Sequence, residues 1–253
     1  MATARRRRGR APLDLRPLTG AGGPRIWWTE WGVTPTHFAP VNDAVFGAPF
    51  VLRGVKAALG SADALAYWVV SDHFEELGWP PTLFHGGFGL LTVGNLRKPR
   101  YWAFELLGRL GPERLAVTVA GDGAGGLVDA LAAGRPDGSI AVLVWNGTLD
   151  QSKVEGDRLL DREVTVRVEG LAADRYRQAL HRIDADHGNV MAAWRALGAP
   201  AWPDAAGWRA LHAADRLEPA EPARDLPVSA GVLELSLAVP MPGVALLELA
   251  PAR

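Results

Sequence analysis

The chain of 253 residues contains no cysteine, which excludes a disulfide framework and a metal site built on thiolates. No apolar run reaches the length of about 18 residues that a transmembrane helix needs, and we expect no membrane partner. Lys and Arg number 27 against 28 Asp and Glu, so the net charge of −1 gives no reason to expect nucleic acid as a partner. The six histidines stand singly, without the i, i+4 spacing of a zinc-binding helix, and we expect no metal.

The first 24 residues lack the apolar core that a signal peptide requires. They hold a basic run at 5–10, followed by a stretch rich in proline and glycine. We interpret residues 1–24 as a disordered basic tail, with a nucleic-acid-binding or targeting patch as the alternative. The missing apolar core favours a cytoplasmic location for this chain, whereas a longer form could be secreted.

The rest of the composition is that of a globular protein, with 48% hydrophobic and 22% charged residues. The length suits one large domain or two modest ones. Ten tryptophans stand against three tyrosines, and many of them lie in or beside the polar motifs described below. Tryptophan faces stack well on sugar rings, but each tryptophan could equally be a large side chain of the core.

The first half of the chain alternates strand and helix patterns. The predicted elements are a buried strand, a helix, a second buried strand, a long loop and a second helix, at 25–29, 42–60, 64–70, 71–96 and 99–111. Asn42 and Asp43 are expected to cap the first helix, and Pro99 to occupy the first turn of the second. Loops as long as the predicted one are commonly functional. This order of elements is typical of the βα units of a (β/α)8 barrel.

Both predicted strands run into carboxylates. Glu30 closes the first strand, and Asp72, Glu75 and Glu76 follow the second. Parallel strands carry such groups to the rim of a barrel, where barrel enzymes keep their chemistry. For Glu30 the residues alone leave two interpretations open, a functional carboxylate or a structural ion pair. The pattern stops near residue 112, whereas a complete barrel needs about 250 residues.

After Pro112 short apolar or alternating runs replace the longer pattern. They predict strands within 115–119, 127–132, 140–145, 164–168, 176–183, 232–239 and 244–249, with short helices at 189–198 and 204–217. Several strands at this spacing indicate an antiparallel β-sandwich. The expected fold class is therefore α/β plus all-β, with an incomplete (β/α)8 TIM barrel at 25–111 and a β-sandwich domain at 112–253.

Short motifs occur in a fixed order along the whole chain. In the first half they are Thr29-Glu30-Trp31, Tyr67-Trp68 followed by Ser71-Asp72 and Phe74-Glu75-Glu76, the run from Phe84 to Leu91, and Lys98-Pro99 with Tyr101 and Phe104. In the second half they are Arg182-Ile183-Asp184, Asp186-His187, Asn189, Trp194 and Pro240-Met241-Pro242. In this order and spacing the motifs resemble glycoside hydrolase family 39, the β-xylosidase and α-L-iduronidase type of enzyme, over residues 25–253.

The resemblance implies a retaining glycosidase, which uses two carboxyl groups about 5–5.5 Å apart. It places the nucleophile at Glu30, at the end of the seventh strand of the barrel. Such an enzyme needs no metal, and we expect no cofactor. The implied partner is a β-xyloside or a related oligosaccharide, and no feature of the sequence indicates an oligomeric state.

The resemblance also implies a set of substrate-binding residues. Trp68 would form a floor under the sugar at the innermost subsite, and Trp31 beside the nucleophile belongs to the same set. Glu75 and Glu76 would accept hydrogen bonds from sugar hydroxyls, with a solvated acidic loop tip as the alternative. His85 would contact the ligand, or would be a structural histidine held by a hydrogen bond.

The general acid/base of the family is the Glu of an Asn-Glu-Pro motif, and no Asn-Glu-Pro occurs in this sequence. The six βα units that would carry it are absent as well. We therefore expect the chain to be the C-terminal half of a longer enzyme, through a truncated gene, a misplaced start or a split reading frame. General acid catalysis contributes about 10²–10⁴-fold, so little activity is expected from this chain alone.

Other functions remain open at this stage. One alternative is a non-catalytic carbohydrate-binding protein, and another is a scaffold that contacts no sugar. Within the hydrolases, an α-L-iduronidase-like enzyme would need a cationic clamp for the uronate group. Arg97, Lys98 and Arg100 lie close enough in sequence to form one.

Overall fold

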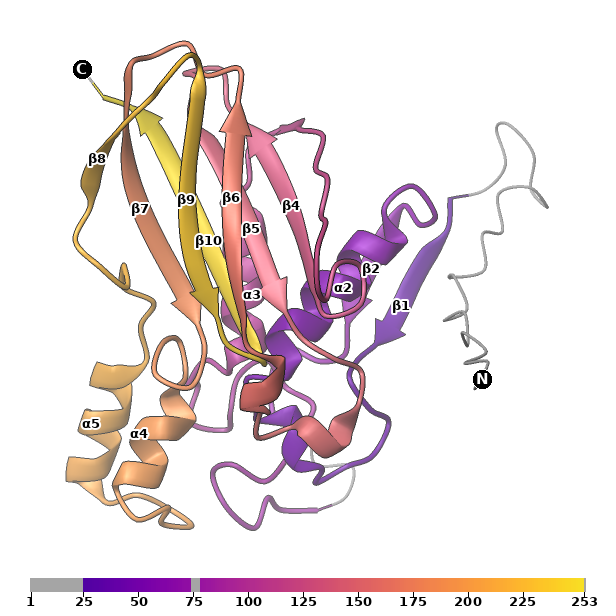
Figure 1. The fold of residues 1–253 in the computed structure, drawn as a ribbon. Helices are drawn as coiled ribbons and strands as arrows, with labels where there is room; N and C mark the ends of the chain where they lie inside the picture. The colour runs from indigo at the N-terminus through magenta and orange to yellow at the C-terminus, as the bar shows by residue number, and fades with distance from the viewer. Residues whose placement is uncertain (1–24, 74–77, 253) are drawn as a thin grey trace, which may run out of the picture.

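The structure, a computed structural model, describes residues 25–73 and 78–252. The predicted tail at 1–24 and the predicted sugar-binding residues Glu75 and Glu76 lie outside the described residues. Figure 1 shows the described part as four layers: a parallel strand pair, two helices, a six-stranded sheet and a second strand pair. Helices and sheets are thus combined as the predicted α/β plus β class requires.

The first layer is the parallel pair β1 (Trp27–Trp31) and β2 (Ala64–Tyr67). Its parallel direction and the helix between its strands match the predicted βα pattern. The sequence predicts both strands as buried, which is wrong for each: residues 27–30 of β1 are exposed, and the residues of β2 are half-buried or exposed. One face of the pair packs on the helices, and no described element covers the other face.

The second layer consists of α2 (Gly47–Ala58) and α3 (Pro99–Gly108), which pack against each other. Pro99 begins α3 as predicted, at a position where its missing N–H leaves no hydrogen bond unmade. α2 begins five residues later than expected and has no side-chain cap. The predicted capping by Asn42 and Asp43 is therefore wrong.

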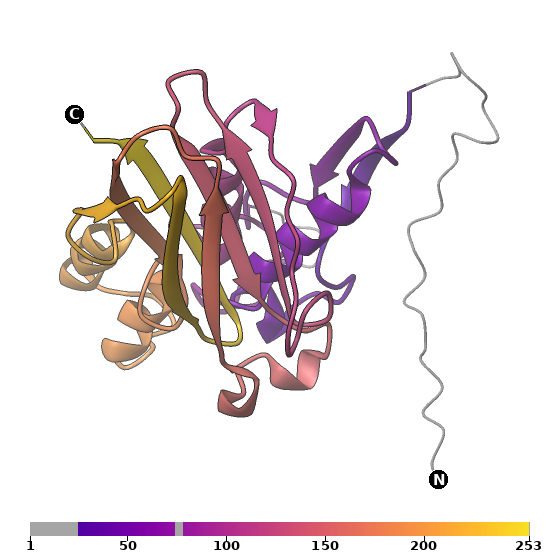
Figure 2. The ribbon, with the colours of Figure 1, turned by 45° about the horizontal axis from the view of Figure 1, so that its top comes forward.

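The two remaining layers are antiparallel sheets that face each other, as Figure 2 shows from above. Within the described residues the larger sheet contains, in spatial order, β3 (Glu113–Arg114), β4 (Val128–Gly134), β5 (Ile140–Asn146), β10 (Gly243–Pro251), β7 (Arg175–Ile183) and β8 (Arg224–Pro227). The smaller sheet pairs β6 (Arg162–Glu169) with β9 (Val232–Val239). The two strands that close the chain, β9 and β10, therefore belong to different sheets.

Two elements of the second half differ from the sequence prediction. Residues 115–119 form no strand, since only Leu115 continues the pairing of β3 by donating a hydrogen bond to Ala132. Beyond that point Leu115 and Val119 pack their side chains on the edge of the core instead of pairing. β8 has no counterpart among the predicted strands, because its proline-flanked sequence shows no apolar alternation.

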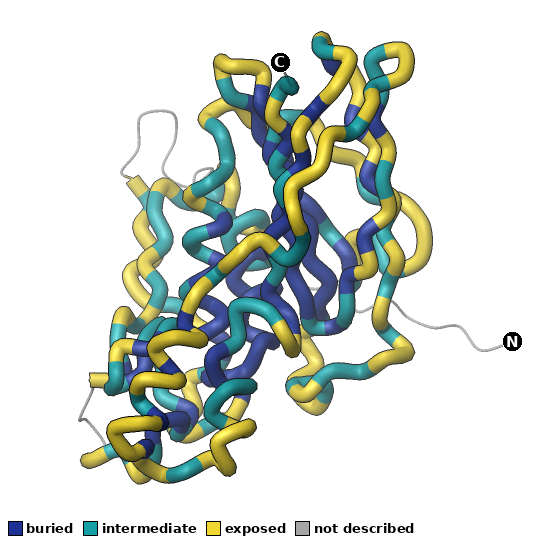
Figure 3. The backbone as a smooth tube through the Cα atoms, turned by 90° about the vertical axis from the view of Figure 1, so that its left-hand side faces the viewer, coloured by how far each residue is buried: buried dark blue, intermediate teal, exposed yellow. Residues whose placement is uncertain are grey.

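Two apolar cores hold the layers together, and both appear as dark blue tube in Figure 3. The core between the two sheets is formed by alternate residues of facing strands, such as Val142, Val166 and Leu247. The core between the helices and the large sheet includes Leu52, Leu106 and Trp145. The second core joins residues from both sides of the boundary predicted near residue 112.

Short helices surround the ends of the sheets. They are the 3-10 turns η1 (Pro40–Asn42), η2 (Gln151–Lys153) and η3 (Arg158–Leu160), and the α-helices α4 (Val190–Ala196) and α5 (Ala205–Ala214). Asp204 caps α5 by accepting a hydrogen bond from the Gly207 N–H. A third core joins α4 and α5 to the loops of the first half through Met191, Leu211 and Phe84. In the described residues no helix is long and apolar enough to cross a bilayer.

Candidate functional site

Glu30 lies near the end of β1, at an irregularity in its pairing with β2. Trp28 pairs with Leu65, and Trp31 pairs with Tyr67, so β1 has one residue more than β2 between these pairs. Thr29 and Glu30 therefore lie opposite the single residue Ala66, which is the arrangement of a β-bulge. All three of these residues are exposed. Glu30 directly precedes Trp31, which packs on the helices, so strand alternation places Glu30 on the opposite, uncovered face of the strand pair.

Trp31 lies on the opposite face, against the helices. Its ring stacks on Phe50 with centroids 5.9 Å apart and meets Tyr67 edge-on at 5.3 Å. Its far edge packs on Gly54, where an added Cβ would come within 2.5 Å of the indole. Trp31 is thus placed between the strand and α2, and it holds β1 on the helix layer from behind Glu30.

Trp68 directly follows β2 and is 37% exposed. Its backbone N–H donates to the Trp31 carbonyl at 3.0 Å, which continues the strand pairing by one residue. Strand alternation places Trp68 on the same face as Ala66, and hence on the face that carries Glu30. The Trp68–Val69 peptide bond is cis.

The segment 88–91 runs beside the chain that leaves β2. Leu90 donates a backbone hydrogen bond to the Val69 carbonyl at 2.9 Å, and Asp72 donates one to the Leu91 carbonyl at 2.9 Å. Asp72 and Leu90, which lie in the predicted loop at 71–96, are therefore held by backbone hydrogen bonds at the end of β2. The neighbouring His85 shares a hydrogen bond with the Thr82 carbonyl at 3.1 Å and is half-buried.

His85 also lines a small cavity of about 20 Å³. His37, Phe38, Asp72, Gly78, Pro80, Gly87 and Phe88 complete the lining. The ring of Phe38 lies 5.9 Å from that of His85. The structure thus brings His85 to the same strand end as Trp68, and gives it one backbone partner.

A buried network of charges fixes the glycine-rich loop at 86–89. The ammonium group of Lys98 lies 2.5 Å from a carboxylate oxygen of Asp43 and 2.7 Å from one of Asp72. The other oxygen of each carboxylate accepts a backbone N–H, from Gly86 at 2.6 Å and from Gly89 at 2.7 Å. All three charged side chains are almost fully buried. The sequence prediction missed this network, since its members are distant along the chain.

Arg100 completes the network from α3. Its guanidinium donates to the carbonyls of Gly87 and Gly89, at 2.8 and 2.6 Å, and to the amide oxygen of Asn42 at 3.2 Å. It also lies 5.5 Å from the centre of the Tyr67 ring. Burial raises the pKa of the Tyr67 hydroxyl, although Arg100 acts in the opposite direction.

The possibility that Arg97, Lys98 and Arg100 form a cationic clamp for a uronate group is wrong for Lys98 and Arg100. Lys98 and Arg100 are 0% and 1% exposed, and their donors are taken by carboxylates and carbonyls of the protein. The third member, Arg97, forms an ion pair with Asp215 at 3.2 Å. These cations build the loop at 86–89 and its surroundings instead of facing a ligand.

The uncovered face of β1 and β2 therefore presents a carboxylate and an aromatic ring on neighbouring strands. Within 25–73 and 78–252, the Glu30 side chain makes no hydrogen bond or ion pair, so these residues offer no structural partner for it. A free carboxylate can attack an electrophilic carbon or accept hydrogen bonds from hydroxyl groups. In the same part of the chain, no group of three His, Asp or Glu side chains could hold a metal ion.

The chain matches a model of the family "Glycosyl hydrolases family 39" over residues 21–231. It is 31% identical to a β-xylosidase of Geobacillus stearothermophilus over 227 residues, which are 89% of this chain and 41% of the relative. A β-xylosidase of Caldicellulosiruptor saccharolyticus is 27% identical over 178 residues, covering 70% of this chain and 35% of that protein.

Solved structures give the same result. The crystal structure of the GH39 enzyme from Xanthomonas axonopodis pv. citri superimposes with a TM-score of 0.75 at 27% identity, covering 91% of this chain and 46% of the other. The chain thus spans less than half the length of the relatives that it matches. Its sequence and its fold agree in the assignment, and the chain belongs to glycosyl hydrolases family 39.

Proposed function

We propose that this chain carries the nucleophile side of a retaining, β-xylosidase-like glycoside hydrolase, with Glu30 as the nucleophile. The observation that carries the proposal is the exposure of Glu30 at an irregularity of β1, on the strand that pairs with the one leading to the partly exposed Trp68. Bulges of this kind are common next to active sites, where they direct a side chain. The β-xylosidase names of two relatives support xylosides as the substrate class.

The proposed chemistry begins with attack of the Glu30 carboxylate on the anomeric carbon of the sugar. The new bond joins a carboxylate oxygen to this carbon, while the bond to the leaving oxygen breaks and its electron pair departs with that oxygen. Water then attacks the same carbon and releases Glu30 as a carboxylate. Two inversions at one carbon give net retention of configuration.

A second carboxyl group is needed to protonate the leaving oxygen and later to activate water. In the enzymes that this sequence resembles, an Asn-Glu-Pro motif carries this group, and the sequence contains no Asn-Glu-Pro. We propose that polypeptide outside this sequence supplies it, and that the chain alone holds half of the site. In this proposal β1, β2, α2 and α3 are βα units of a (β/α)8 barrel at 25–111, and the facing sheets are a β-sandwich domain at 112–253.

The substrate-binding residues have different roles in the proposal. Trp68 forms an apolar floor for the sugar ring, and His85 contacts a hydroxyl from the loop fixed by Lys98. Glu75 and Glu76 accept hydrogen bonds from hydroxyl groups. Trp31 supports the site indirectly, because its ring packs on Phe50 and keeps β1 in place.

The test uses an aryl β-xyloside with a good leaving group, such as 2,4-dinitrophenyl β-xyloside. Such a group departs without protonation, so the missing acid/base does not prevent the first step. Without a general base the second step is slow, and the glycosyl adduct on Glu30 should accumulate. Mass spectrometry of a protease digest locates the adduct.

Two variants separate the possible outcomes. Glu30→Gln should abolish labelling, whereas Glu169→Gln, which alters an exposed carboxylate of β6, should label like the unaltered chain. Saturable release of the aryl group together with the adduct on Glu30 supports the nucleophile. Sugar binding without any adduct would instead support a non-catalytic carbohydrate-binding protein.

A further inference from the structure

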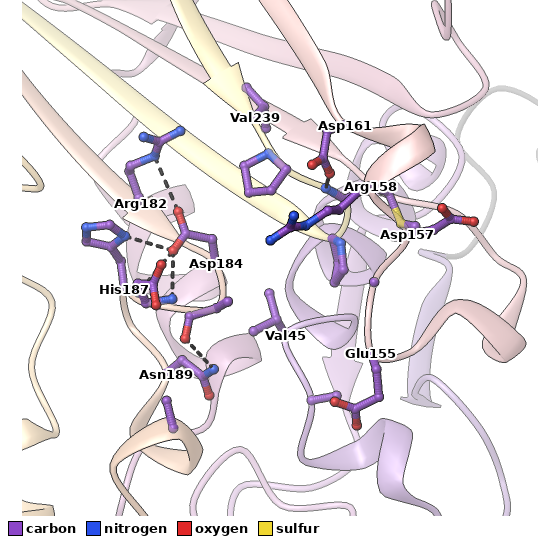
Figure 4. A pocket seen from close by; sticks show the side chains of 18 of the residues that line it. Val45, Glu155, Asp157, Arg158, Asp161, Arg182, Asp184, His187, Asn189 and Val239 are labelled. Atoms are coloured by element: carbon purple, nitrogen blue, oxygen red, sulfur yellow. Dashed lines mark hydrogen bonds and ion pairs between the residues drawn. The ribbon is translucent and has the colours of Figure 1, made fainter. Parts of the chain in front are cut away.

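A second pocket lies where the end of β7, the start of α4, residues 154–163 and the turn between β9 and β10 meet (Figure 4). It has a volume of about 940 Å³, within the range of about 300–1,000 Å³ that is usual for small-molecule sites. None of Glu30, Trp31, Trp68 and His85 lines it. We call it the β7–α4 pocket.

One wall of the β7–α4 pocket is built by the motif Arg182-Ile183-Asp184 with Asp186-His187, which the proposed function does not use. Asp184 is 6% exposed, and one of its oxygens accepts the backbone N–H groups of Asp186 and His187, both at 3.0 Å. The same oxygen lies 2.7 Å from Nδ1 of His187. For its other oxygen, the part of the chain that the structure describes offers only Arg182 Nε, 3.4 Å away.

The geometry of this wall leaves polar groups that can still bond. Because Nδ1 of His187 is engaged by Asp184, its Nε2 stays available, and the side chain is 38% exposed. Asn189 donates its amide to the Ala185 carbonyl at 3.1 Å. Its amide oxygen is buried and has no hydrogen-bond partner among the described residues, which is uncommon for a buried acceptor.

The facing wall supplies a cation. Arg158 begins η3, and its guanidinium extends across the β7–α4 pocket toward Asp184 in Figure 4. Its side chain forms no hydrogen bond or ion pair with any residue in the described ranges. By contrast, Arg195 on the rim is held by both carboxylate oxygens of Glu155 at 3.1 Å.

The mixture of groups points to a neutral, hydroxyl-rich ligand. Carboxylates and guanidinium groups both line the β7–α4 pocket, so a ligand of strong charge would meet like charges on one wall. A sugar hydroxyl can donate to Asp184 or Asn189 and accept from Arg158. Val45, Val239 and Pro242 supply apolar surface for the C–H groups of a sugar ring.

We propose that the β7–α4 pocket is an accessory binding site for a neutral sugar unit of an oligosaccharide. Arg158 donates to its hydroxyls, and Asp184 and Asn189 accept from them. The site is independent of Glu30, and its function would be to hold glycan on the sheet half of the molecule. The inference does not require the proposed hydrolysis to be correct.

The test measures binding to the full chain by calorimetry with three neutral trisaccharides: xylotriose, cellotriose and maltotriose. Arg158→Ala removes an exposed side chain without a partner, so the fold should be retained. It should weaken binding of the best trisaccharide at least fivefold. Arg216→Ala, which alters an exposed arginine paired with Glu218 outside the pocket, is the matched control and should leave the affinity unchanged.

Three results would overturn the inference. The first is that none of the three trisaccharides binds at millimolar concentration. The second is that Arg158→Ala binds with the same affinity as the unaltered chain. The third is that Trp68→Ala loses binding while Arg158→Ala retains it. The last result would place the sugar on the Glu30 face. If the unaltered chain formed no adduct on Glu30 but still bound a trisaccharide in a way that depends on Arg158, only the proposed function would be contradicted.

Discussion

At the scale of single residues, Lys98 organises the site although it does not face it. Its ammonium group neutralises two buried carboxylates, Asp43 and Asp72, and each of these accepts a backbone N–H from the loop at 86–89. Buried charges are tolerated only when they are paired and hydrogen-bonded, and both conditions are met here. The loop next to His85 therefore depends on a cation that is fully buried and lies away from the exposed face of β1 and β2.

Replacement of Lys98 should strongly destabilise the protein. Lys98→Met leaves two uncompensated carboxylates in the core, and breaking a buried ion pair typically costs about 3–5 kcal/mol. Arg195→Met is the control, because the Arg195–Glu155 pair at 3.1 Å is at least half exposed and is worth at most about 1 kcal/mol. Urea denaturation of both variants checks this, and equal losses of unfolding free energy would contradict it.

His181 should make stability depend on pH. Burial lowers the pKa of its imidazole, and the neighbouring Arg109 acts in the same direction, while Glu248 acts against both. The unfolded chain, whose His titrates near its usual value of about 6.5, therefore takes up a proton more readily than the folded one. The contribution of neutral His181 to the stability of the folded chain is therefore complete above about pH 6.5 and declines as the pH falls below that value.

The measurement compares the unfolding free energy of the unaltered chain and His181→Gln between about pH 7.5 and 5. Other groups titrate in both proteins, so the difference in slope isolates the contribution of His181. The unaltered chain should lose stability more steeply as the pH falls. Equal pH dependence of the two unfolding free energies would show that His181 makes no contribution, and a steeper loss in His181→Gln would show that its contribution has the opposite sign.

Some residues of the candidate site could be predicted from the sequence, and others could not. Glu30, Trp68 and His85 belong to contiguous motifs, so the sequence could single them out. The network of Asp43, Asp72 and Lys98 joins residues far apart in sequence, and each looks like an ordinary surface charge or cap in its local context. Their positions depend on how the loop at 86–89 folds over α3, which local patterns do not encode.

At the scale of elements, the extra residue in β1 lies at the position of Glu30, in the pairing between Trp28 and Trp31. Trp31 fixes the register from behind by packing on α2, where Gly54 leaves room for its indole. Strand and helix periodicity predicted most elements of the chain, because their apolar faces are continuous. The bulge, the late start of α2 and the separation of β9 from β10 depend on tertiary contacts and were outside the reach of periodicity.

Gly54→Ala should destabilise the protein in spite of the better helix propensity of alanine. The new Cβ would lie 2.5 Å from the Trp31 ring, and overpacking of this kind costs about 1–3 kcal/mol. The matched control is Gly108→Ala at the end of α3, where an added Cβ meets no atom within 4 Å. This control should be neutral or gain less than about 1 kcal/mol. A thermal shift of the same sign and size in both variants would contradict the packing argument.

At the scale of the whole molecule, one core crosses the predicted domain boundary. Leu52 of α2 and Leu106 of α3 are fully buried against Leu143 and Leu246 of the large sheet. The large sheet therefore covers part of the apolar surface of the helix layer. Such a shared core couples the folding of the two parts.

Hydrogen exchange should reveal this coupling. The slowest backbone amides of α2 and of β5 should exchange with the same free energy of opening, because neither element can open without exposing the shared core. Leu143→Ala in β5 should lower both values equally, by about 2–5 kcal/mol. A loss of protection in β5 with unchanged protection in α2 would show that the two parts unfold separately.

The proposed role of Glu30 as a nucleophile in half of a glycosidase site can be tested on the chain itself. The most direct test is the mass of the intact chain after incubation with 2,4-dinitrophenyl β-xyloside, followed by peptide mapping. We expect the chain to gain the mass of one pentosyl unit, located on Glu30 and absent from Glu30→Gln. An unchanged mass under conditions where the xyloside demonstrably binds, or an adduct on another carboxylate, would contradict it.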